Sequence, residues 1–312
     1  MQTGYKTTFW ISCAIVLLLL LVPTLGSKYL IDLTTEILIY ALFALSLNVL
    51  IGYSGNISFG HAAYFAIGGY SCAILLTTYE LPLIISMPAA IILSGLAATF
   101  VGYFCVKLTD IYFAMLTLAF GMLVWAVAFK WRAVTGGDDG FVGVNVPAFI
   151  DNRHGFFYFT LFVVTVSAAL LWLICHSAFG RTLVAVRENR IRAGFVGVNT
   201  TRLRHTAFVV AGTFAGIAGS LFAMYNRGVY VESAFWTESG QVLIMALLGG
   251  LYSFFGPVLG AAVLYTLQVG INQYTEYWPV VLGIILLVIL MFLPDGLIGL
   301  ARKIRGQFSR KA

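Results

Sequence analysis

The sequence has 312 residues, of which 61% are hydrophobic and only 10% are charged, and its mean hydropathy is +0.96. Because an ordinary soluble domain carries roughly 25% charged residues, this composition excludes a soluble globular protein and indicates a chain that crosses a membrane several times. The formal net charge of +6 is concentrated in two segments described below, which favours orientation of the chain in a bilayer over binding to nucleic acid.

Apolar runs of membrane-spanning length follow one another along the chain. The first, residues 9–25, follows Lys6 and resembles a signal peptide, but a second run begins at Tyr29, which favours a first membrane span that is retained. The later runs cover residues 30–51, 62–78, 83–106, 111–129, 155–175, 206–225, 240–270 and 277–293. The predicted fold class is all-α: one polytopic transmembrane domain over residues 1–312, with about eight to ten membrane helices.

Few polar or reactive side chains interrupt these runs. Asp32 and Glu36 lie one helical turn apart near the start of the second run, where we expect both carboxylates to reach water at the membrane surface. The cysteines lie inside apolar runs without CxxC spacing, which indicates small buried hydrophobes rather than a zinc site or a disulfide framework. They are Cys13, Cys72, Cys105 and Cys175.

Residues 52–70, GYSGNISFGHAAYFAIGGY, place five glycines and several polar side chains in apolar sequence long enough to cross a bilayer. A helix has to break here. Non-helical backbone at membrane depth persists only where protein or a water-filled cavity satisfies its N–H and C=O groups, so the break predicts a lined transport pathway. The alternative is a tight turn that joins two ordinary helices at one membrane surface. The candidate pathway residues are Gly52, Ser54, Gly55, Asn56, Ser58, Gly60 and His61.

The second half of the chain contains a similar interruption. The apolar run 240–270 is broken by Gly249, Gly250, Gly256 and Pro257, which are further candidate pathway residues. We expect two short helices, 241–248 and 257–267, arranged either as a re-entrant pair or as two short crossings. Glycine- or proline-interrupted apolar segments in both halves of a chain indicate a transport pathway.

Basic residues gather in two hydrophilic segments. Residues 177–205 carry a single acid, Glu188, and the tail 301–312 carries five bases. By the positive-inside rule both segments are cytoplasmic, which with an even number of crossings places both termini in the cytoplasm. The arginines of the longer segment are Arg181, Arg187, Arg190, Arg192, Arg202 and Arg204.

The remaining polar features indicate no catalytic or metal centre. Asp138, Asp139 and Asp151 lack the alternating spacing of an EF-hand loop, so we expect solvated acids and no metal site. His61 is either a proton carrier in the pathway or a hydrogen-bond donor to an exposed carbonyl. No nucleophile, acid and base arrangement is evident, so an enzyme is not expected.

The chain lacks the means to drive active transport alone. It has no GxxxxGK[ST] phosphate loop, so we expect no ATP site or other cofactor in this chain. It also has no hydrophilic segment long enough for an extracytoplasmic binding domain. If capture and energy are needed, other chains supply them; the rival class is a self-sufficient channel or ion-coupled carrier.

These motifs together resemble one protein family. The residues are LNVLIGYSGNISFGHAAYFAIGGY (47–70), DIYFAMLTLAFG (110–121), TGGDDG (135–140), GRTLVAVREN (180–189), GVNTTRLRHTAFVVAGTFAGIAGSLFA (197–223) and GGLYSFFGPVLGAAV (249–263). They resemble the branched-chain amino acid ABC importer permeases, with the closer likeness to the LivM-type subunit. The resemblance implies a multi-pass permease of the bacterial cell inner membrane. Its implied partners are a second, LivH-like permease, two ATP-binding subunits that hold the ATP, and a periplasmic substrate-binding protein.

The resemblance also assigns a role to the arginine-rich segment and limits the substrate. It implies that residues 180–197 form the segment that rests on the ATPase subunits, although Arg190 and Arg192 make it more basic than is usual in the family. Hydrophobic amino acids suit an apolar pathway, and the same family includes importers of urea, of short-chain amides and of aromatic acids. The implied coupling residues are Gly180, Arg181, Ala185, Arg187, Glu188, Asn189 and Gly197.

Overall fold

The computed structural model describes residues 17–25, 27–274 and short stretches between 277 and 299. Residues 9–16 of the first predicted span, most of the predicted span 277–293 and the basic tail 301–312 therefore lie outside the described residues, as does Cys13. Helix α2, Val22–Leu25, is the described end of the first of these spans.

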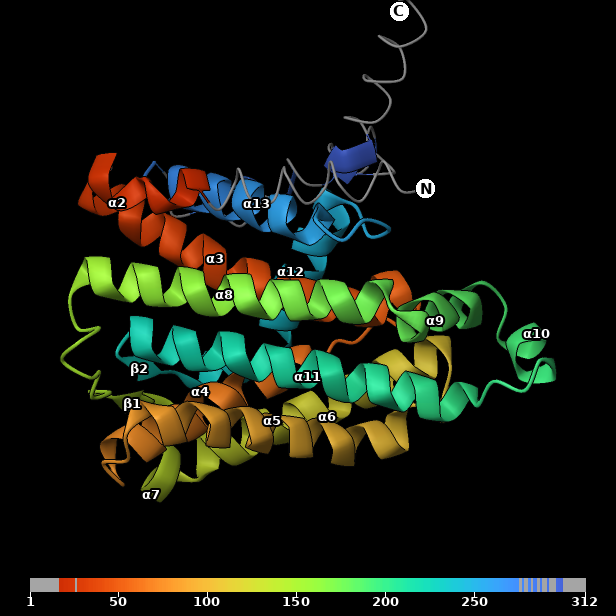
Figure 1. The fold of residues 1–312 in the computed structure, drawn as a ribbon. Helices are drawn as coiled ribbons and strands as arrows, with labels where there is room; N and C mark the ends of the chain where they lie inside the picture. Colours follow the sequence, from red (N-terminus) through yellow and green to blue (C-terminus); the bar gives the residue numbers. More distant parts are fainter. Residues whose placement is uncertain are drawn as a thin grey trace, which may run out of the picture.

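The described part of the chain is a bundle of apolar helices (Figure 1). Five of them are long and apolar enough to cross a membrane, and α4, α12 and α13 are shorter. The predicted all-α, polytopic fold is therefore confirmed. The five are α3 (Lys28–Asn48), α5 (Leu83–Cys105), α6 (Asp110–Lys130), α8 (Arg153–His176) and α11 (Thr200–Tyr225), and the shorter three are α4 (His61–Thr77), α12 (Trp236–Gly249) and α13 (Gly256–Asn272).

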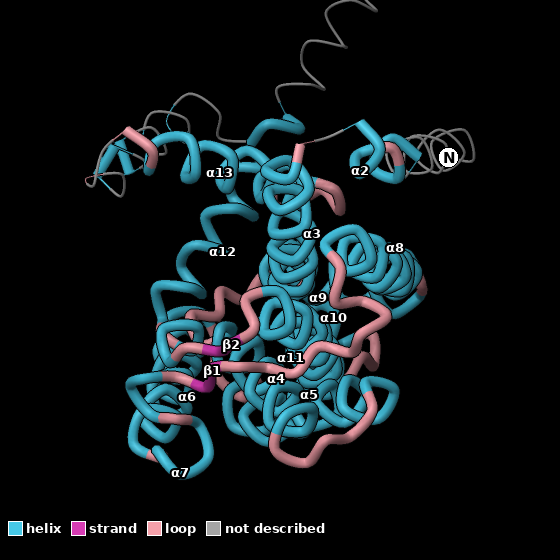
Figure 2. Tube along the Cα trace, turned by 90° about the vertical axis from the view of Figure 1, so that its left-hand side faces the viewer, coloured by secondary structure: helices cyan, strands magenta, loops and turns pink. Residues whose placement is uncertain are grey.

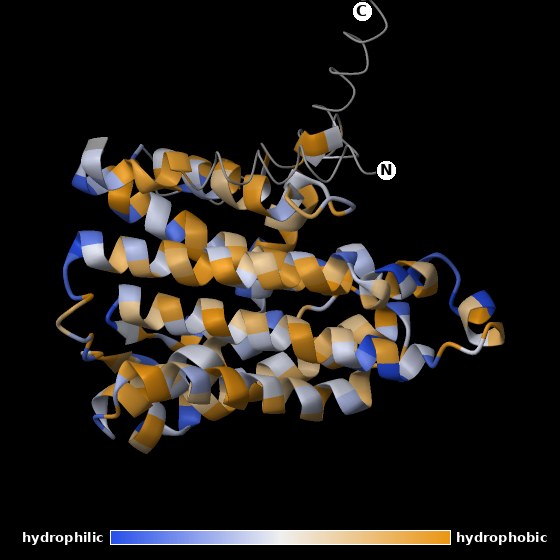
Figure 3. Ribbon diagram, in the orientation of Figure 1, coloured by the Kyte–Doolittle hydropathy of each residue, from blue (hydrophilic) through white to orange (hydrophobic). Residues whose placement is uncertain are grey.

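Short elements lie at the two ends of the bundle. The strands β1 (Phe141–Val142) and β2 (Gly228–Val229) pair antiparallel at one end, which we call the strand end. Helices α9 (Ala178–Glu188) and α10 (Arg190–Phe195) lie at the opposite end, which we call the arginine end (Figure 1). Hydrophilic residues are concentrated at these two ends, as a membrane-spanning bundle requires (Figure 3). Between β1 and α6 lie α7 (Arg132–Thr135) and a 3₁₀ turn, Gly137–Asp139.

Local sequence explains where several helices begin and end. Ser27 caps α3 by accepting a hydrogen bond from the Leu30 amide. Pro82 precedes the first residue of α5, where its missing N–H costs no helical hydrogen bond. Helix α6 carries Asp110 in its first turn and Lys130 in its last, which complements the helix dipole at both ends.

Helix α11 packs closely against α4 and α5 (Figure 2), and small residues make the contacts. A Cβ on Gly219 would overlap the Phe65 carbonyl, and one on Gly68 would overlap the Gly216 backbone. Ser94 of α5 donates a hydrogen bond to the Gly212 carbonyl at 2.9 Å. Membrane helices associate through such close contacts because lipid supplies no hydrophobic drive between them. This core is the frame against which the interrupted segments are held.

Large apolar side chains on the outer surfaces of α5, α6 and α8 face away from this core. They make a surface suited to lipid, which solvates apolar side chains at no cost. Examples are Ile92, Leu96, Phe100, Ile111, Met115, Phe162 and Leu170.

Candidate pathway and coupling site

The first predicted break is present. Helix α3 widens into a turn of π-helix, Val49–Tyr53, and the chain then runs without helix to His61, where α4 begins. The Asn56 amide donates to the Leu50 carbonyl at 2.9 Å, so part of the freed backbone finds partners in the widened turn. Gly55 has φ +73°, a conformation in which a side chain is strained.

The break reaches into the middle of the bundle. A Cβ on Gly60 would overlap the Thr117 carbonyl of α6. Gly121, also of α6, lies against Gly60 as well. These two residues are near the centre of α6, so α4 starts about halfway between the two ends. The amide of Ala62, in the first turn of α4, donates to Ser239 Oγ at 2.8 Å. A tight turn at one membrane surface is therefore the wrong alternative.

The second predicted break is a turn between two short helices. Helix α12 ends at Gly249, Gly250 has φ 114°, and α13 starts at Gly256 with Pro257 in its first turn. Both helices are longer than the sequence predicts, since the predicted helices cover only residues 241–248 and 257–267. The turn lies at the arginine end, where the Phe254 ring is 6.2 Å from that of His176. Because the turn lies at that end, it does not match a pair that enters from the strand end and turns within the membrane. Helix α12 itself begins near Ser239, about halfway along the bundle.

A third non-helical segment was not predicted. After α11 the chain passes through β2 and a 3₁₀ turn, Val231–Ala234, which packs against α4 and α6 before α12 begins. Phe235 contacts Trp125 of α6, with ring centroids 5.4 Å apart. The signal in the sequence is the apolar run GVYV directly after Arg227, where a solvent loop would be polar.

The two breaks meet at the arginine end. Asn48, in the last turn of α3, donates to the Ser253 carbonyl in the second break at 3.3 Å. A Cβ on Gly52 would overlap the Leu251 carbonyl, so the two backbones touch where a glycine allows it. Candidate pathway residues from separate halves of the sequence thus form one site.

Arg187 contacts both breaks. Its guanidinium donates to the Gly52 carbonyl and lies 4.8 Å from the centre of the Tyr252 ring. Its side chain also packs against Gly55, and Nη2 pairs with Glu188 at 2.6 Å. The sequence predicted Arg187 and Gly52 as parts of different sites, and the structure brings them into contact.

Arg204 has a different position from the one expected. The sequence predicts a hydrophilic loop at this position, but α11 begins at Thr200 and Arg204 is only 3% exposed. Its guanidinium donates to Asn56 Oδ1 at 2.5 Å and to the carbonyls of Val106 and Leu108 at 2.9 and 3.0 Å. The extra turns of α11 form because Asn199 caps the helix by accepting from the Arg202 amide.

His61 lies at the junction of the break and α4. Its Nε2 is 2.8 Å from Ser46 Oγ, and its ring stacks on Phe43 with centroids 5.4 Å apart. The residue is fully buried. Its hydrogen-bond partner is a hydroxyl, and not the exposed carbonyl considered from the sequence. Ser58 is also fully buried, while Ser54 accepts a hydrogen bond from Asn56.

The predicted coupling residues lie on α9, α10 and their flanks. Gly180 fits against the Cys175 carbonyl, where a Cβ would overlap, and so allows α9 to fold back on the end of α8. Asn189 separates the two helices and caps α10 by accepting from the Arg192 amide at 2.9 Å. Arg181, Ala185 and Glu188 are exposed on α9, and Gly197 has φ +90° after α10.

Helix α10 projects at the extreme of the arginine end (Figure 1), and apolar side chains are exposed on it and directly after it. Ile191, Phe195 and Val196 are 72%, 88% and 84% exposed. By contrast, Leu183 and Val186 of α9 are buried against the bundle. The arginine end thus holds one helix fixed to the two breaks and another that projects from the protein.

Comparison with known proteins identifies the family. The family described as the branched-chain amino acid transport system permease component matches residues 29–290. The chain belongs to this family. It is 29% identical to the high-affinity branched-chain amino acid transport system permease protein LivM of Salmonella typhimurium, over 90% of this chain and 72% of that protein.

Two other relatives match over most of their length. LivM of Escherichia coli is 28% identical, over 90% of this chain and 72% of the relative. The permease protein LivH of Salmonella typhimurium is 26% identical, over 83% of this chain and 91% of the relative. No solved structure matches the chain.

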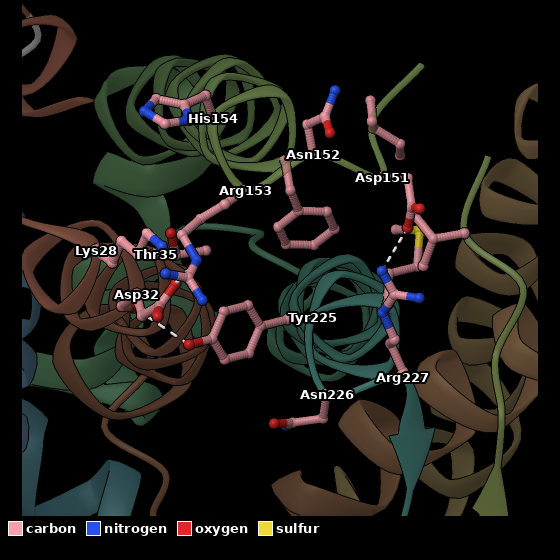
Figure 4. A pocket seen from close by; sticks show the side chains of 14 residues that line it. Lys28, Asp32, Thr35, Asp151, Asn152, Arg153, His154, Tyr225, Asn226 and Arg227 are labelled. Atoms are coloured by element: carbon pink, nitrogen blue, oxygen red, sulfur yellow. Dashed lines mark hydrogen bonds and ion pairs between the residues drawn. The ribbon is translucent and has the colours of Figure 1, made fainter. Parts of the chain in front are cut away.

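At its strand end this permease has a polar cavity of about 750 Å³ between α3, α8 and α11 (Figure 4). Arg153 pairs with Asp32 at 3.0 Å, and Arg227 pairs with Asp151. The Tyr225 hydroxyl donates to the Asp32 carbonyl at 3.4 Å. Most of the charges that line the cavity are therefore matched within the permease itself.

Asp151, one of three acids considered for a calcium site, is thus paired with Arg227. Within the described residues, no group of three potential metal ligands lies together.

Proposed function

We propose that this permease is one transmembrane subunit of an ATP-driven importer, and that solute passes beside the two interrupted segments. Its relatives are named as permeases of high-affinity branched-chain amino acid transport systems. On this proposal it pairs with a second, LivH-like permease and two ATP-binding subunits, and it receives solute from an extracytoplasmic substrate-binding protein. ATP binds only to the partner subunits.

The proposal places the arginine end in the cytoplasm of a bacterial cell, with the permease in the inner membrane and both termini cytoplasmic. The concentration of arginines in residues 177–205 supports this orientation. The exposed apolar tip of α10 is then available to a cytoplasmic partner. An amphipathic helix whose apolar residues project into solvent suits a groove on another protein.

The observation that carries the proposal is the position of Arg187. Displacement of α9 by the ATPase subunits would move Arg187, which holds the Gly52 carbonyl of one break and the Tyr252 ring of the other. Leu183 and Val186 seat α9 on the bundle, so a shift of α9 would be passed to the elements that it contacts. The two breaks lack regular helical hydrogen bonds, so they deform more easily than the helices that flank them when α9 is displaced.

The proposed substrates are branched-chain or other hydrophobic amino acids. The names of the relatives and the apolar walls of the bundle support them. A permease for urea or short-chain amides is the alternative within the same class. A self-sufficient channel or ion-coupled carrier is the alternative from another class.

Reconstitution tests the proposal. The permease is placed in proteoliposomes with its four partner chains, and uptake of labelled leucine and ATP hydrolysis are measured together. Uptake that needs ATP and all partners supports the importer. Uptake by the permease alone, driven by a gradient and indifferent to ATP, identifies a channel or carrier instead.

The coupling role has its own variant. Arg187→Gln removes the contacts with both breaks, so ATP hydrolysis should continue while leucine uptake falls at least tenfold. Arg202→Gln is the matched control, since Arg202 is exposed and lies in the same segment. Unchanged uptake in Arg187→Gln contradicts the coupling role.

A further inference from the structure

The strand-end cavity holds its charged side chains in two ion pairs. Arg153 pairs with Asp32 at one side, Arg227 pairs with Asp151 at the other, and the Tyr225 ring lies between the two pairs (Figure 4). All five side chains line the one cavity, whose volume is about 750 Å³. Sites for small molecules have volumes of about 300–1,000 Å³, so the cavity has the size of a ligand site.

Apolar side chains line the same cavity. Phe156 of α8, Met224 of α11 and Ile150, which lies shortly before α8, are largely buried and reach the cavity with part of their surface. The Phe156 and Tyr225 rings lie against each other, with centroids 6.0 Å apart. An apolar group that covers this wall removes apolar surface from water, which is favourable. A ligand with an apolar chain therefore suits the cavity better than a purely polar one.

Lys28, the first residue of α3, lines the cavity without a partner. The ion pairs among the described residues do not include its ammonium, although Asp32 lies one helical turn away on the same helix. Residues four apart on a helix have Cβ atoms about 5–6 Å from each other. Asp32 pairs with Arg153 through Oδ1 at 3.0 Å, and no ion pair within the described residues uses its Oδ2. Helix α3 therefore presents a free ammonium beside a carboxylate oxygen that is free of ion pairs.

A free ammonium beside a carboxylate matches the two charges of a zwitterion. The carboxylate of such a ligand accepts from Lys28 and its ammonium donates to Asp32, through charge-assisted hydrogen bonds that are about twice as strong as neutral ones. A ligand with negative charge only is repelled by Asp32 and Asp151, and a neutral solute such as urea leaves both charges of α3 unmatched. Charge and apolar contact together favour a zwitterion that carries an apolar chain.

Helix α3 connects the cavity to the first break. Thr35 lies at the inner limit of the cavity on this helix, and beyond it Ile39 and Leu42 are fully buried. Thirteen residues separate Thr35 from Asn48, which touches the second break, and they span about 20 Å at 1.5 Å per residue. A ligand in the cavity is therefore on the strand-end side of closely packed helices and has not yet reached the breaks.

We propose that the strand-end cavity is an entry site for a zwitterion with an apolar chain, namely a hydrophobic amino acid before it passes the breaks. Lys28 binds its carboxylate, Asp32 binds its ammonium, and the wall around Phe156 takes its side chain. The proposal rests on the proposed function, because that function places the strand end on the extracytoplasmic side, where the substrate-binding protein releases solute. The headgroup of phosphatidylethanolamine carries the same two kinds of charge, so the test separates lipid from solute.

The test measures equilibrium binding of labelled leucine to the membrane complex, which contains both permeases and both ATP-binding subunits, without the substrate-binding protein. In nanodiscs of phosphatidylglycerol we expect unlabelled leucine to compete at least tenfold better than leucinamide, N-acetylleucine or urea, each of which lacks one or both charges. Nanodiscs with equal parts of phosphatidylethanolamine should give the same affinity for leucine. Loss of leucine binding in these nanodiscs assigns the cavity to the lipid headgroup and overturns the amino acid site.

Two substitutions remove the charges of the site. Lys28→Met and Asp32→Asn should each weaken leucine binding at least tenfold with unchanged melting temperature, and Lys28→Arg should keep most of the affinity. The matched controls are Lys130→Met and Asp139→Asn, since both residues are exposed and neither lines the cavity. Both controls should bind leucine normally.

Failure of the site and failure of the proposed function give different results. Wild-type affinity in both Lys28→Met and Asp32→Asn overturns the site, and so does weaker binding that appears only together with a lower melting temperature. If the complete importer takes up leucine with ATP while the membrane complex binds none, the site has failed and the proposed function stands. If the complete importer moves urea and no amino acid, the proposed substrate class itself has failed.

Discussion

The Arg204 guanidinium donates to Asn56 Oδ1 at 2.5 Å and so joins the start of α11 to the first break. Arg187 holds the same break at Gly52, four residues earlier. The two arginines lie at either side of α10, which projects from the bundle between them. A force on α10 therefore acts on the break from both sides, through two charge-assisted hydrogen bonds.

Replacement of Arg204 by Met should destabilise the permease by about 3 kcal/mol. The substitution keeps most of the apolar stem of the side chain. It leaves three acceptors without their donor, namely Asn56 Oδ1 and the carbonyls of Val106 and Leu108. A buried acceptor without a donor costs about 1–3 kcal/mol before the surroundings relax. Thermal unfolding in detergent measures the loss as a lower melting temperature.

Arg202→Met is the control for this prediction, because Arg202 is exposed two residues away on the same helix. It should unfold at the wild-type temperature. Arg204→Lys should recover little of the lost stability, since a single ammonium cannot reproduce the planar set of N–H donors of the guanidinium. A melting temperature that is equal in Arg204→Met and wild type contradicts the buried network.

Substitution of Gly60 should disturb the first break. A Cβ at this position strikes the Thr117 carbonyl, so Gly60→Ala forces α4 and α6 apart at a cost of about 1–3 kcal/mol, and Gly60→Leu costs more. We expect leucine uptake to fall with Gly60→Ala and to be lost with Gly60→Leu. Gly240→Ala is the control, because its Cβ meets open space. Normal uptake by Gly60→Leu contradicts a pathway beside the break.

Much of the fold follows from the sequence alone. The run 83–106 predicts α5, Leu83–Cys105, almost residue for residue, because long apolar segments bounded by Pro82 and Lys107 leave few alternatives. The start of α11 was misplaced by six residues, since arginines at a helix start look like a loop by charge counting. The capping side chain of Asn199 was the signal that decides the boundary.

The candidate site was predictable only in parts. Glycine and proline patterns identified both breaks, because those residues act locally on the backbone. Their meeting at Arg187 depends on a contact across 135 residues, which no local pattern encodes. The Glu36–Tyr265 contact spans 229 residues, and the local sequence predicts for Glu36 only a carboxylate at the membrane surface.

The exposed tip of α10 should be needed for assembly with the ATPase subunits. The triple variant Ile191→Ser/Phe195→Ser/Val196→Ser removes apolar surface that the permease itself does not bury. Co-purification of the ATP-binding subunits with the tagged permease should be lost, while the melting temperature of the permease is unchanged. Retained co-purification contradicts docking through α10 and leaves α9 as the contact.

Asp32 and Glu36 lie one turn apart on α3 and should respond differently to loss of charge or polarity. Asp32 pairs with Arg153, and both side chains are well exposed, at 37% and 44%, so Asp32→Asn should change stability by less than about 1 kcal/mol. Glu36→Leu leaves the Tyr265 hydroxyl unpaired between membrane helices and should cost about 1–3 kcal/mol. Glu36→Gln still accepts from Tyr265 and should be close to wild type in stability. Thermal unfolding of the three variants in one detergent checks the order, and equal melting temperatures for Glu36→Leu and Glu36→Gln contradict the hydrogen bond.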